Sequence, residues 1–256
     1  MMPFLVQPPE PNDLALRVYL LGTVDFEVAL RFQRRLHFEI GENRAQAALV
    51  LCEHPPSISV GRLGSHAHVH LNGDDLGSWR MPQRWVNRGG GCILHLPGQL
   101  AVYPIFPLDR LGLDVAAYLQ RLGQVFVDLT ADFSLRAPAS ADDTGLWVGG
   151  RLAAAFGVSV RDWVTSFGAY LNVQPQLDLY RFVQPTATLR APMTSLECER
   201  RGPVRTAMVR QRLVEHFQTR FGFSRVALFT DHPALSGNVQ RPRSRTRVAG
   251  SMSKRA

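Results

Sequence analysis

The stretch NRGGGCILHLPGQLAVYPI, residues 87–105, decides the fold of this chain. It sets an arginine and three glycines, Arg88 to Gly91, before an apolar run that ends in His95, and a Pro-Gly turn leads into a second apolar run. Glycines let backbone N–H groups come close to a ligand, where they can hold an oxygen atom. The stretch lacks the GK[ST] of a phosphate loop and the GxGxxG of a dinucleotide site. Taken alone, it is equally compatible with a glycine-rich β-turn.

The segments around this stretch predict an α+β domain without regular βαβ alternation. Short apolar runs, several of them stopped by Pro or Gly, predict strands at 14–21, 46–53, 57–62, 99–106, 146–173 and 225–229. Apolar residues at helical spacing predict helices at 24–41, 113–133 and 204–223. Within 146–173, Arg161-Asp162 is expected to join two antiparallel strands. Residues 63–82 are polar and glycine-rich, which predicts a loop.

Size and composition predict one domain, residues 1–237, followed by a basic tail, residues 238–256. The 256 residues are 45% hydrophobic and 20% charged, an ordinary globular balance. No apolar stretch is long enough for a membrane span and the first residues lack the pattern of a signal peptide, so a cytoplasmic protein without a membrane partner is expected. The three cysteines form no CxxC pair and are expected to be reduced thiols.

The net charge of +8 is concentrated in the tail. Residues 238–256 carry six positive charges and no acid, which leaves +2 for the rest of the chain. This distribution is typical of a solvated, disordered end, and we do not expect nucleic acid as a partner. The folded part also contains no lysine, because Lys254 is the only one in the chain.

Five segments together carry a family resemblance: EHPPSISVGR (53–62), NRGGGCILHLPGQLAVYPI (87–105), GRLAAAFGV (150–158), WVTSFGAYLNV (163–173) and VQPTATL (183–189). In this order and spacing they resemble the octanoyltransferases of lipoate biosynthesis, which belong to the biotin/lipoate protein ligase superfamily. The resemblance implies an α+β catalytic domain with a mixed, mainly antiparallel sheet flanked by helices. It also implies transfer of an octanoyl group from acyl carrier protein, through a cysteine, to a lysine of a lipoyl domain in 2-oxoacid dehydrogenases or the glycine cleavage protein. No cofactor is implied.

The resemblance also implies which residues line the acyl pocket. They come from the glycine-rich segment, from the strand that ends in Phe156-Gly157 and from the strand that contains Gly168. The implied substrate-binding residues are Arg88, Gly89, Gly90, Gly91, Cys92, Ile93, Leu94, His95, Ala155, Phe156, Gly157, Gly168, Ala169 and Tyr170.

The sequence departs from the family pattern at the positions that carry the chemistry. Thr186 stands at the place of the acyl-thioester cysteine, and Leu152 stands at the place of the lysine that lowers its pKa. Phe167 replaces the histidine before Gly168. In the glycine-rich segment, the usual threonine, tyrosine and glycine are replaced by Ile93, Leu94 and Leu96.

These replacements predict a family member without the normal activity. A cysteine is activated by a small downward shift of its pKa, whereas a threonine needs a positioned general base. Ligases of the superfamily need a pocket lysine, by the same resemblance, and the folded part has none. Two alternatives remain: a divergent acyltransferase that uses Thr186 or Cys92 with His95, and a non-catalytic protein that binds a partner through its basic tail. Cys198 is a weaker candidate nucleophile than Cys92.

The histidines of SHAHVH form the one metal-like pattern. His66, His68 and His70 alternate, and on a strand they would share one face with Asp74 or Asp75 nearby. Because the surrounding composition is that of a loop, we interpret them as surface histidines and expect no metal site.

Overall fold

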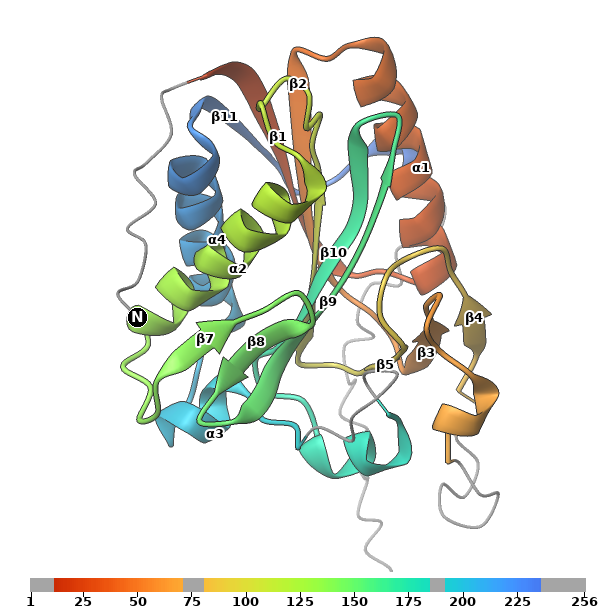
Figure 1. Ribbon diagram of the computed structural model, residues 1–256, viewed down its shortest axis with the longest axis vertical. Helices are drawn as coiled ribbons and strands as arrows, with labels where there is room; N and C mark the ends of the chain where they lie inside the picture. Colours follow the sequence, from red (N-terminus) through yellow and green to blue (C-terminus); the bar gives the residue numbers. More distant parts are fainter. Residues whose placement is uncertain (1–11, 71–80, 185–191, 236–256) are drawn as a thin grey trace, which may run out of the picture.

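The computed structural model describes residues 12–70, 81–184 and 192–235. A large sheet divides the molecule, and a small sheet lies beside its lower end (Figure 1). The strand order of the large sheet is β11 (Phe223–Phe229), β1 (Asn12–Thr23), β2 (Gln46–Glu53), β6 (Gln99–Ile105), β10 (Val164–Asn172), β9 (Arg151–Arg161), β8 (Gly145–Val148), β7 (Ala139–Ala141). The order of the small sheet is β4 (Gln83–Trp85), β3 (Ser57–Val60), β5 (Cys92–His95).

The large sheet is mixed and mainly antiparallel. Only β1 pairs in parallel, with β11 on one side and β2 on the other. The pairs from β2 through β6, β10, β9 and β8 to β7 are all antiparallel. The predicted α+β architecture is therefore confirmed.

Helices cover both faces of the large sheet. The α-helices are α1 (Phe26–Glu42), α2 (Val115–Ala131), α3 (Leu196–Arg200) and α4 (Thr206–Phe221), and the short 3-10 helices are η1 (His66–His68), η2 (Leu177–Phe182) and η3 (Pro233–Leu235). Asp25 and Asp114 cap α1 and α2, because their side chains accept hydrogen bonds from backbone N–H groups of the first turn. In Figure 1, α2 and α4 lie on one face of the sheet and α1 lies on the other.

Each face buries its own apolar core. Leu14, Leu16 and Leu49 point toward the face that α2 and α4 cover, and Tyr19 and Val50 belong to the core beneath α1. This alternation along neighbouring strands is the period-two pattern of a sheet buried on both faces. A third apolar cluster, around Ile58, Leu94 and Tyr180, joins the small sheet to η2.

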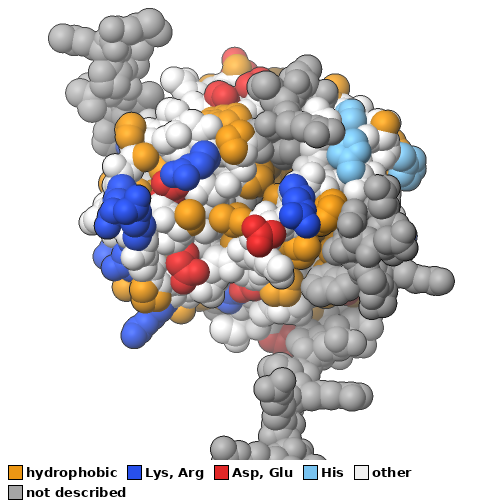
Figure 2. All heavy atoms as spheres, turned by 90° about the horizontal axis from the view of Figure 1, so that it is seen from below, with side chains coloured by type: hydrophobic (Ala, Val, Ile, Leu, Met, Phe, Trp, Pro, Cys, Tyr) orange, Lys and Arg blue, Asp and Glu red, His pale blue; other side chains and the backbone are white. Residues whose placement is uncertain are grey.

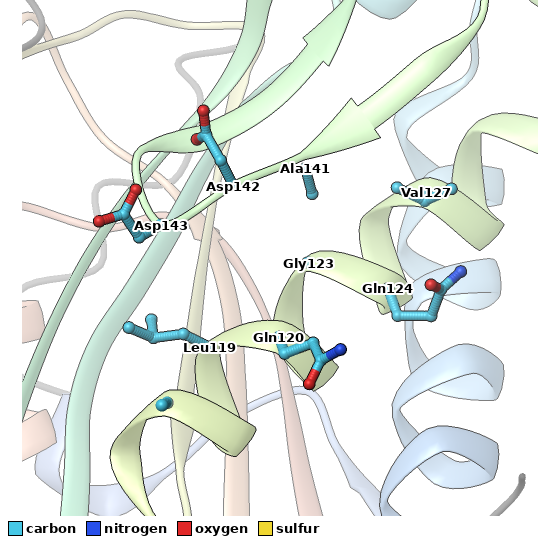
Figure 3. A pocket seen from close by; sticks show the side chains of 9 residues that line it. Leu119, Gln120, Gly123, Gln124, Val127, Ala141, Asp142 and Asp143 are labelled. Carbon is cyan, nitrogen blue, oxygen red and sulfur yellow. The ribbon is translucent and has the colours of Figure 1, made fainter. Parts of the chain in front are cut away.

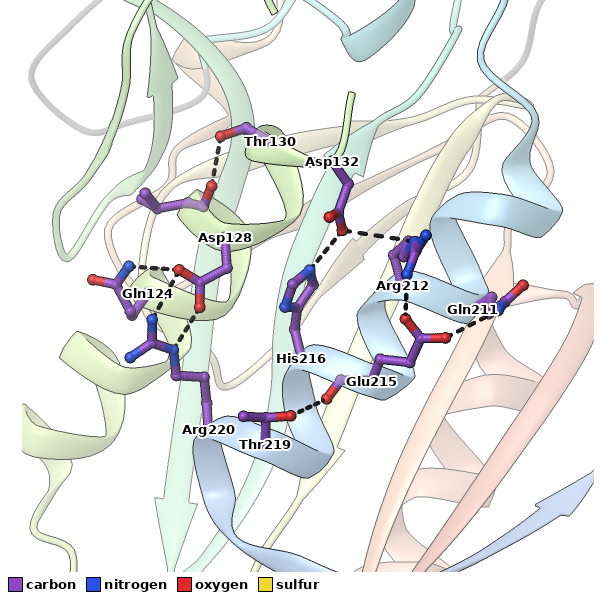
Figure 4. A network of polar contacts seen from close by, with 11 residues as sticks. Gln124, Asp128, Thr130, Asp132, Gln211, Arg212, Glu215, His216, Thr219 and Arg220 are labelled. Atoms are coloured by element: carbon purple, nitrogen blue, oxygen red, sulfur yellow. Dashed lines mark hydrogen bonds and ion pairs between the residues drawn. The ribbon is translucent and has the colours of Figure 1, made fainter. Parts of the chain in front are cut away.

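Helices α2 and α4 are also joined by ion pairs across their exposed sides (Figure 4). Arg220 binds Asp128 in a bidentate pair, and His216 contacts Asp132 at 2.7 Å. Arg212 lies 2.8 Å from Glu215 within α4. Exposed pairs of this kind contribute little to stability, roughly 0–1 kcal/mol each. They lie away from the glycine-rich segment and serve the packing of the two helices.

Most predicted elements occur where the sequence placed them, and three short strands are additional. β4, β5 and β7 have three or four residues each and carry no periodic signal of useful length. Val115 is an apolar residue of the helix predicted at 113–133, yet it is 43% exposed, because it is the first residue of α2.

Candidate active site

The glycine-rich segment forms a loop that ends in β5. β5 pairs with β3, and Ser59 lies opposite Ile93. The loop contacts the large sheet where Gly89 N–H donates to the carbonyl of Val158 in β9, at 2.9 Å. The segment therefore connects the small sheet to β9, at the place where the resemblance to octanoyltransferases implies an acyl pocket.

Arg88 lies inside this loop, with a fully buried side chain. Its guanidinium donates to the carbonyls of Gly89 and Gly91 at 2.9 and 3.0 Å, and to the carbonyl and hydroxyl oxygens of Ser59 at 2.9 and 2.7 Å. It also lies 5.6 Å from the ring centre of Tyr170. Burial lowers the pKa of Arg88, and no carboxylate in the described parts of the chain forms an ion pair with it. Arg88 therefore supports the loop from within the protein.

Two glycines allow the strands to approach this arginine and one another. A Cβ atom on Gly157 would lie 2.8 Å from the Cδ of Arg88. A Cβ on Gly168 would lie 2.2 Å from the carbonyl oxygen of Val102. Gly157 and Gly168 face each other across β9 and β10, so both are needed for close packing.

His95 lies beneath the loop and has partners on both ring nitrogens. Its Nε2 is 2.8 Å from the Ser59 hydroxyl, and its Nδ1 is 3.2 Å from the side-chain oxygen of Gln99. Because the side-chain oxygen of Gln99 can only accept, Nδ1–H donates to it, and in a neutral ring Nε2 then accepts from the Ser59 hydroxyl. The ring stacks on Phe26, with centroids 4.9 Å apart. Burial, with His54 and Arg88 nearby, holds the pKa of His95 well below its usual range.

Gln99 extends this buried network away from the loop. Its amide group donates to the hydroxyl of Tyr180 at 2.8 Å, and that hydroxyl donates to Asn172 at 2.9 Å. Asn172 in turn donates to the carbonyl of Thr194 at 3.1 Å. These contacts join the Pro-Gly turn, β10 and the segment that precedes α3.

Leu152 lies at the start of β9, beside that same segment. Its backbone N–H donates to Pro192 at 2.8 Å, and its carbonyl accepts from Thr194 N–H at 3.0 Å. The side chain is fully buried in an apolar cluster that includes Ile93 and Tyr170.

Most of the other expected pocket residues are also buried, whereas Gly89 and Gly90 are partly exposed. Ala155, Phe156, Ala169 and Tyr170 are at most 6% exposed, and Ile93, Leu94 and Leu96 at most 4%. Phe167 is half-buried, with φ 59, and its N–H donates to the side chain of Gln33 in α1. Thr186 lies outside the described residues.

The cysteines differ in access. Cys92 is buried, its thiol donates to the carbonyl of Ser65 at 3.5 Å, and burial raises its pKa. Cys52 is buried and burial raises its pKa to about 12. Cys198 in α3 is exposed. Neither buried thiol has the depressed pKa and access that a nucleophile requires.

The histidines of residues 65–70 form a short 3-10 helix and its exit. Trp85 donates to the Nε2 of His66 at 3.2 Å, and the Nδ1 of His66 lies 3.0 Å from the side-chain oxygen of Gln83. Both nitrogens of His66 thus have partners. The described residues contain no group of three metal-ligating side chains, and Asp74 and Asp75 lie outside them.

Comparison with known proteins identifies the family. Residues 25–218 match the model of the lipoyl protein ligase A/B catalytic domain. The chain is 34% identical over 197 residues to an octanoyltransferase of Geobacter metallireducens, covering 77% of this chain and 89% of the relative. It is 37% identical over 209 residues to an octanoyltransferase of Solibacter usitatus, covering 79% and 91%. The chain belongs to the octanoyltransferase family.

The fold agrees with this assignment to the family. A crystal structure of lipoate-protein ligase A bound with ATP superposes with a TM-score of 0.70 at 15% identity, covering 90% of this chain and 92% of the ligase. A putative lipoate protein ligase from T. acidophilum with bound lipoic acid gives 0.65 at 16% identity, with the same coverage. The expected ligase-like α+β catalytic domain is confirmed. Among the described helices, none has the length and apolar character to cross a bilayer.

Sequence reasoning missed the partners that hold the octanoyltransferase-family loop in place. Ser59 lies in an apolar strand and has no sequence feature that marks it, yet its hydroxyl accepts a hydrogen bond from Arg88 and contacts the Nε2 of His95. Asn172 and Tyr180 are separated in sequence from the Gln99 that they contact. Gln99 itself could have been found, because a polar residue that opens a buried strand needs a partner.

A groove of about 550 Å³ lies outside this site, between α2 and the turn after β7 (Figure 3). Leu119, Gln120, Gly123 and Gln124 line it from the helix, and Asp142 and Asp143 from the turn. The Asp142 carboxylate accepts from the Thr144 hydroxyl and from the backbone N–H groups of Thr144 and Gly145, and these hydrogen bonds outweigh partial burial and lower its pKa. The groove contains none of the predicted pocket residues.

Proposed function

We propose that this octanoyltransferase-family protein of lipoate biosynthesis keeps the catalytic fold but does not carry out the usual octanoyl transfer. The observation that carries the proposal is Leu152, a fully buried hydrocarbon side chain in an apolar cluster. By resemblance, a lysine at this place lowers the pKa of the acyl-accepting cysteine, and Thr186 holds the place of that cysteine. A leucine supplies no charge, and a threonine hydroxyl is a far weaker acid than a thiol.

The alternative of a divergent acyltransferase has less support. It needs Thr186 or Cys92 as nucleophile and His95 as general base. The thiol of Cys92 is buried with a raised pKa, and both nitrogens of His95 are occupied by Ser59 and Gln99. A base must be within reach of the proton that it removes, and here each nitrogen already faces another partner.

The partners are carried over from the family as proposals. They are octanoyl-acyl carrier protein and the lipoyl domains of 2-oxoacid dehydrogenases or the glycine cleavage protein, met in the cytoplasm by a single domain of residues 1–237. The pocket residues named from the sequence, from Arg88 to Tyr170, would line the site. The basic tail, 238–256, lies outside the described residues.

The test is an incubation of the full chain with octanoyl-acyl carrier protein and an apo lipoyl domain, followed by intact mass measurement. We expect no octanoyl mass on the lipoyl domain and none on the chain. Octanoylated lipoyl domain would overturn the proposal, and Thr186→Ala and Cys92→Ala variants would then show which residue carries the acyl group. The double variant Leu152→Lys with Thr186→Cys asks whether the missing pair alone accounts for the inactivity. An active family member serves as the positive control.

A further inference from the structure

Strand β7 forms one edge of the large sheet, and among the described strands it pairs only with β8. Toward β8, the backbone N–H of Asp142 donates to the carbonyl of Gly145 at 3.1 Å. Because alternate residues of an antiparallel strand bond to a given neighbour, Ala139 and Ala141 direct their N–H and C=O groups away from β8. The open edge of the sheet thus offers two N–H donors and two C=O acceptors.

A hollow lies on each face of the sheet beside this edge. On the α2 face is the groove of about 550 Å³, toward which Ala141 points in Figure 3. On the opposite face, Trp147, Gly149 and Gly150 line a second hollow of about 430 Å³, and Trp147 lies opposite Ser140 of β7. Side chains that alternate along a strand added to this edge would therefore enter the two hollows in turn.

The groove on the α2 face has an acidic end. Asp142 and Asp143 follow β7 directly, and neither forms an ion pair with any described residue. Leu119 and Val127 of α2 line the same groove. A long cationic side chain can thus lay its hydrocarbon stem on these apolar residues and bring its charge to a carboxylate.

The basic tail contains a segment with a matching alternation. Its sequence is RPRSRTRV, residues 241–248. In an extended chain the side chains divide between two faces, so that the four arginines share one face and the smaller residues share the other. The second set consists of Pro242, Ser244, Thr246 and Val248.

Antiparallel pairing with β7 determines which hollow each set enters. Residues directly opposite one another carry their side chains on the same face of the sheet. Arginines that bond to the backbone of Ala139 and Ala141 therefore place their side chains in the groove that ends at Asp143. The set that contains Pro242 then turns its backbone outward, where a proline is tolerated, and its smaller side chains meet the smaller hollow.

The tail of the same chain is too short to reach β7 in this way. The described residues end at Leu235 in the core beneath α1, and the ring of His232 lies 5.7 Å from that of Tyr19 in β1. Six strand spacings separate β1 from β7, roughly 29 Å across the sheet. The eight residues from Leu235 to Arg243 span at most about 28 Å, and the path must also leave the α1 face. The segment therefore comes from a second copy of the chain.

We propose that residues 241–248 of one copy of this chain add as an antiparallel strand to β7 of a second copy. The arginines lie along the groove and meet Asp143, and the backbones of Ala139 and Ala141 pair with the added strand. Figure 2 views the lower end of the molecule, toward which β7 lies in Figure 1, and acidic and basic side chains both reach this surface. Charge alone does not select the edge, so backbone pairing is part of the proposal. It does not depend on whether the protein transfers octanoyl groups.

The test is sedimentation velocity of the full chain over a range of concentrations, at low and at high salt. The tail variant is Arg243→Glu with Arg245→Glu, and the edge variant is Asp143→Arg. The control is Glu42→Arg, which makes the same charge change at an exposed acid of α1 that has no ion pair with any described residue. The edge variant retains Asp142, whose hydrogen bonds hold the turn, and thermal unfolding checks that each variant is native.

We expect salt-sensitive self-association that the tail variant and the edge variant each weaken roughly tenfold or more at low salt, whereas Glu42→Arg changes it little. The edge variant keeps an intact tail and the tail variant keeps an intact edge, so a mixture of the two should associate although neither does so alone. No self-association of the unmodified chain, or no recovery in the mixture, would overturn the proposal. Association that the tail variant abolishes and Asp143→Arg leaves unchanged would place the tail elsewhere and overturn it as well.

A peptide of residues 239–250 tests the backbone pairing without altering the fold. It should compete with self-association, and N-methylation at Arg243 and Arg245 should abolish the competition, because these N–H groups bond to β7. N-methylation at Ser244 and Thr246 should leave it intact, and equal competition by the two methylated peptides would refute the added strand. Octanoyl transfer is measured separately, so an active enzyme that associates through β7 would refute the proposed inactivity and leave this inference standing.

Discussion

Substituting Leu152 by lysine places an ammonium group at a site that is now fully buried and apolar. A lysine has an ordinary pKa near 10.4, and full burial lowers it to about 5–6. At pH 7 the folded protein would then hold the neutral amine, whereas the unfolded chain would hold the ammonium. Because pH 7 lies about 3.4 units below the pKa of the unfolded lysine, the substitution costs about 4.6 kcal/mol of stability at this pH. That is a large part of the roughly 5–15 kcal/mol available to a domain.

The cost should fall as the pH rises. Between the lowered folded pKa and 10.4 the unfolded chain binds a proton that the folded chain does not, so stability of the Leu152→Lys variant increases with pH by about 1.4 kcal/mol per unit. Urea unfolding at several pH values between 7 and 10 measures this, with Leu152→Met as the matched control, for which a loss under about 1.5 kcal/mol is expected. A lysine variant as stable as the methionine control at pH 7, with no added pH dependence, would refute the reasoning, since the amine must then reach water or an acidic partner.

Two further predictions concern buried titratable groups. His54 is buried, with ring nitrogens 2.7 Å from the Val24 carbonyl and 2.7 Å from the Tyr103 hydroxyl, and burial lowers its pKa to about 4. The unfolded ring protonates near 6.5, so His54 should lower stability by up to about 3 kcal/mol as the pH falls from about 6.5 to 4. Because the pKa of His95 is lowered too, His54→Gln should remove only part of this decline in urea unfolding against pH, and an unchanged profile would count against the prediction. In native protein, iodoacetamide should modify the exposed Cys198 and spare Cys92 and Cys52, as mass spectrometry of peptides can show; rapid modification of Cys92 would revive it as a nucleophile.

The sequence predicted the long elements well because their apolar spacing is repeated over many residues. α2 and the hairpin of β9 and β10 have burial patterns that follow the residue types closely. Of the small sheet it predicted only β3, within 57–62, because β4 and β5 are three and four residues long and pair with β3 through long-range contacts. Nor could it predict that β1 joins β11 in parallel, because that pairing links the two ends of the domain.

The candidate site was located by resemblance, but the roles of its residues came from geometry. Nothing in the spacing of Arg88 and Ser59 indicates that the guanidinium turns inward to a serine 29 residues away. His95 and Gln99 are close in sequence, but the sequence does not show that Gln99 contacts the Nδ1 of His95 while Ser59 contacts its Nε2. Tertiary packing determines the contacts in polar networks of this kind. The sequence therefore indicates some of the residues involved but not which of them form hydrogen bonds with one another.

The glycine-rich segment can therefore be maintained by folding requirements alone. Arg88 satisfies the carbonyls of its own loop, His95 joins Ser59 to Gln99, and Gly157 leaves room for the arginine. Each of these contacts is between described residues of the chain and needs no acyl group. Leu152 is by contrast a buried hydrocarbon at the place where, by the resemblance, a lysine is expected. The contacts of the glycine-rich segment therefore support the fold, and the proposed loss of activity has to be tested at Leu152 and Thr186.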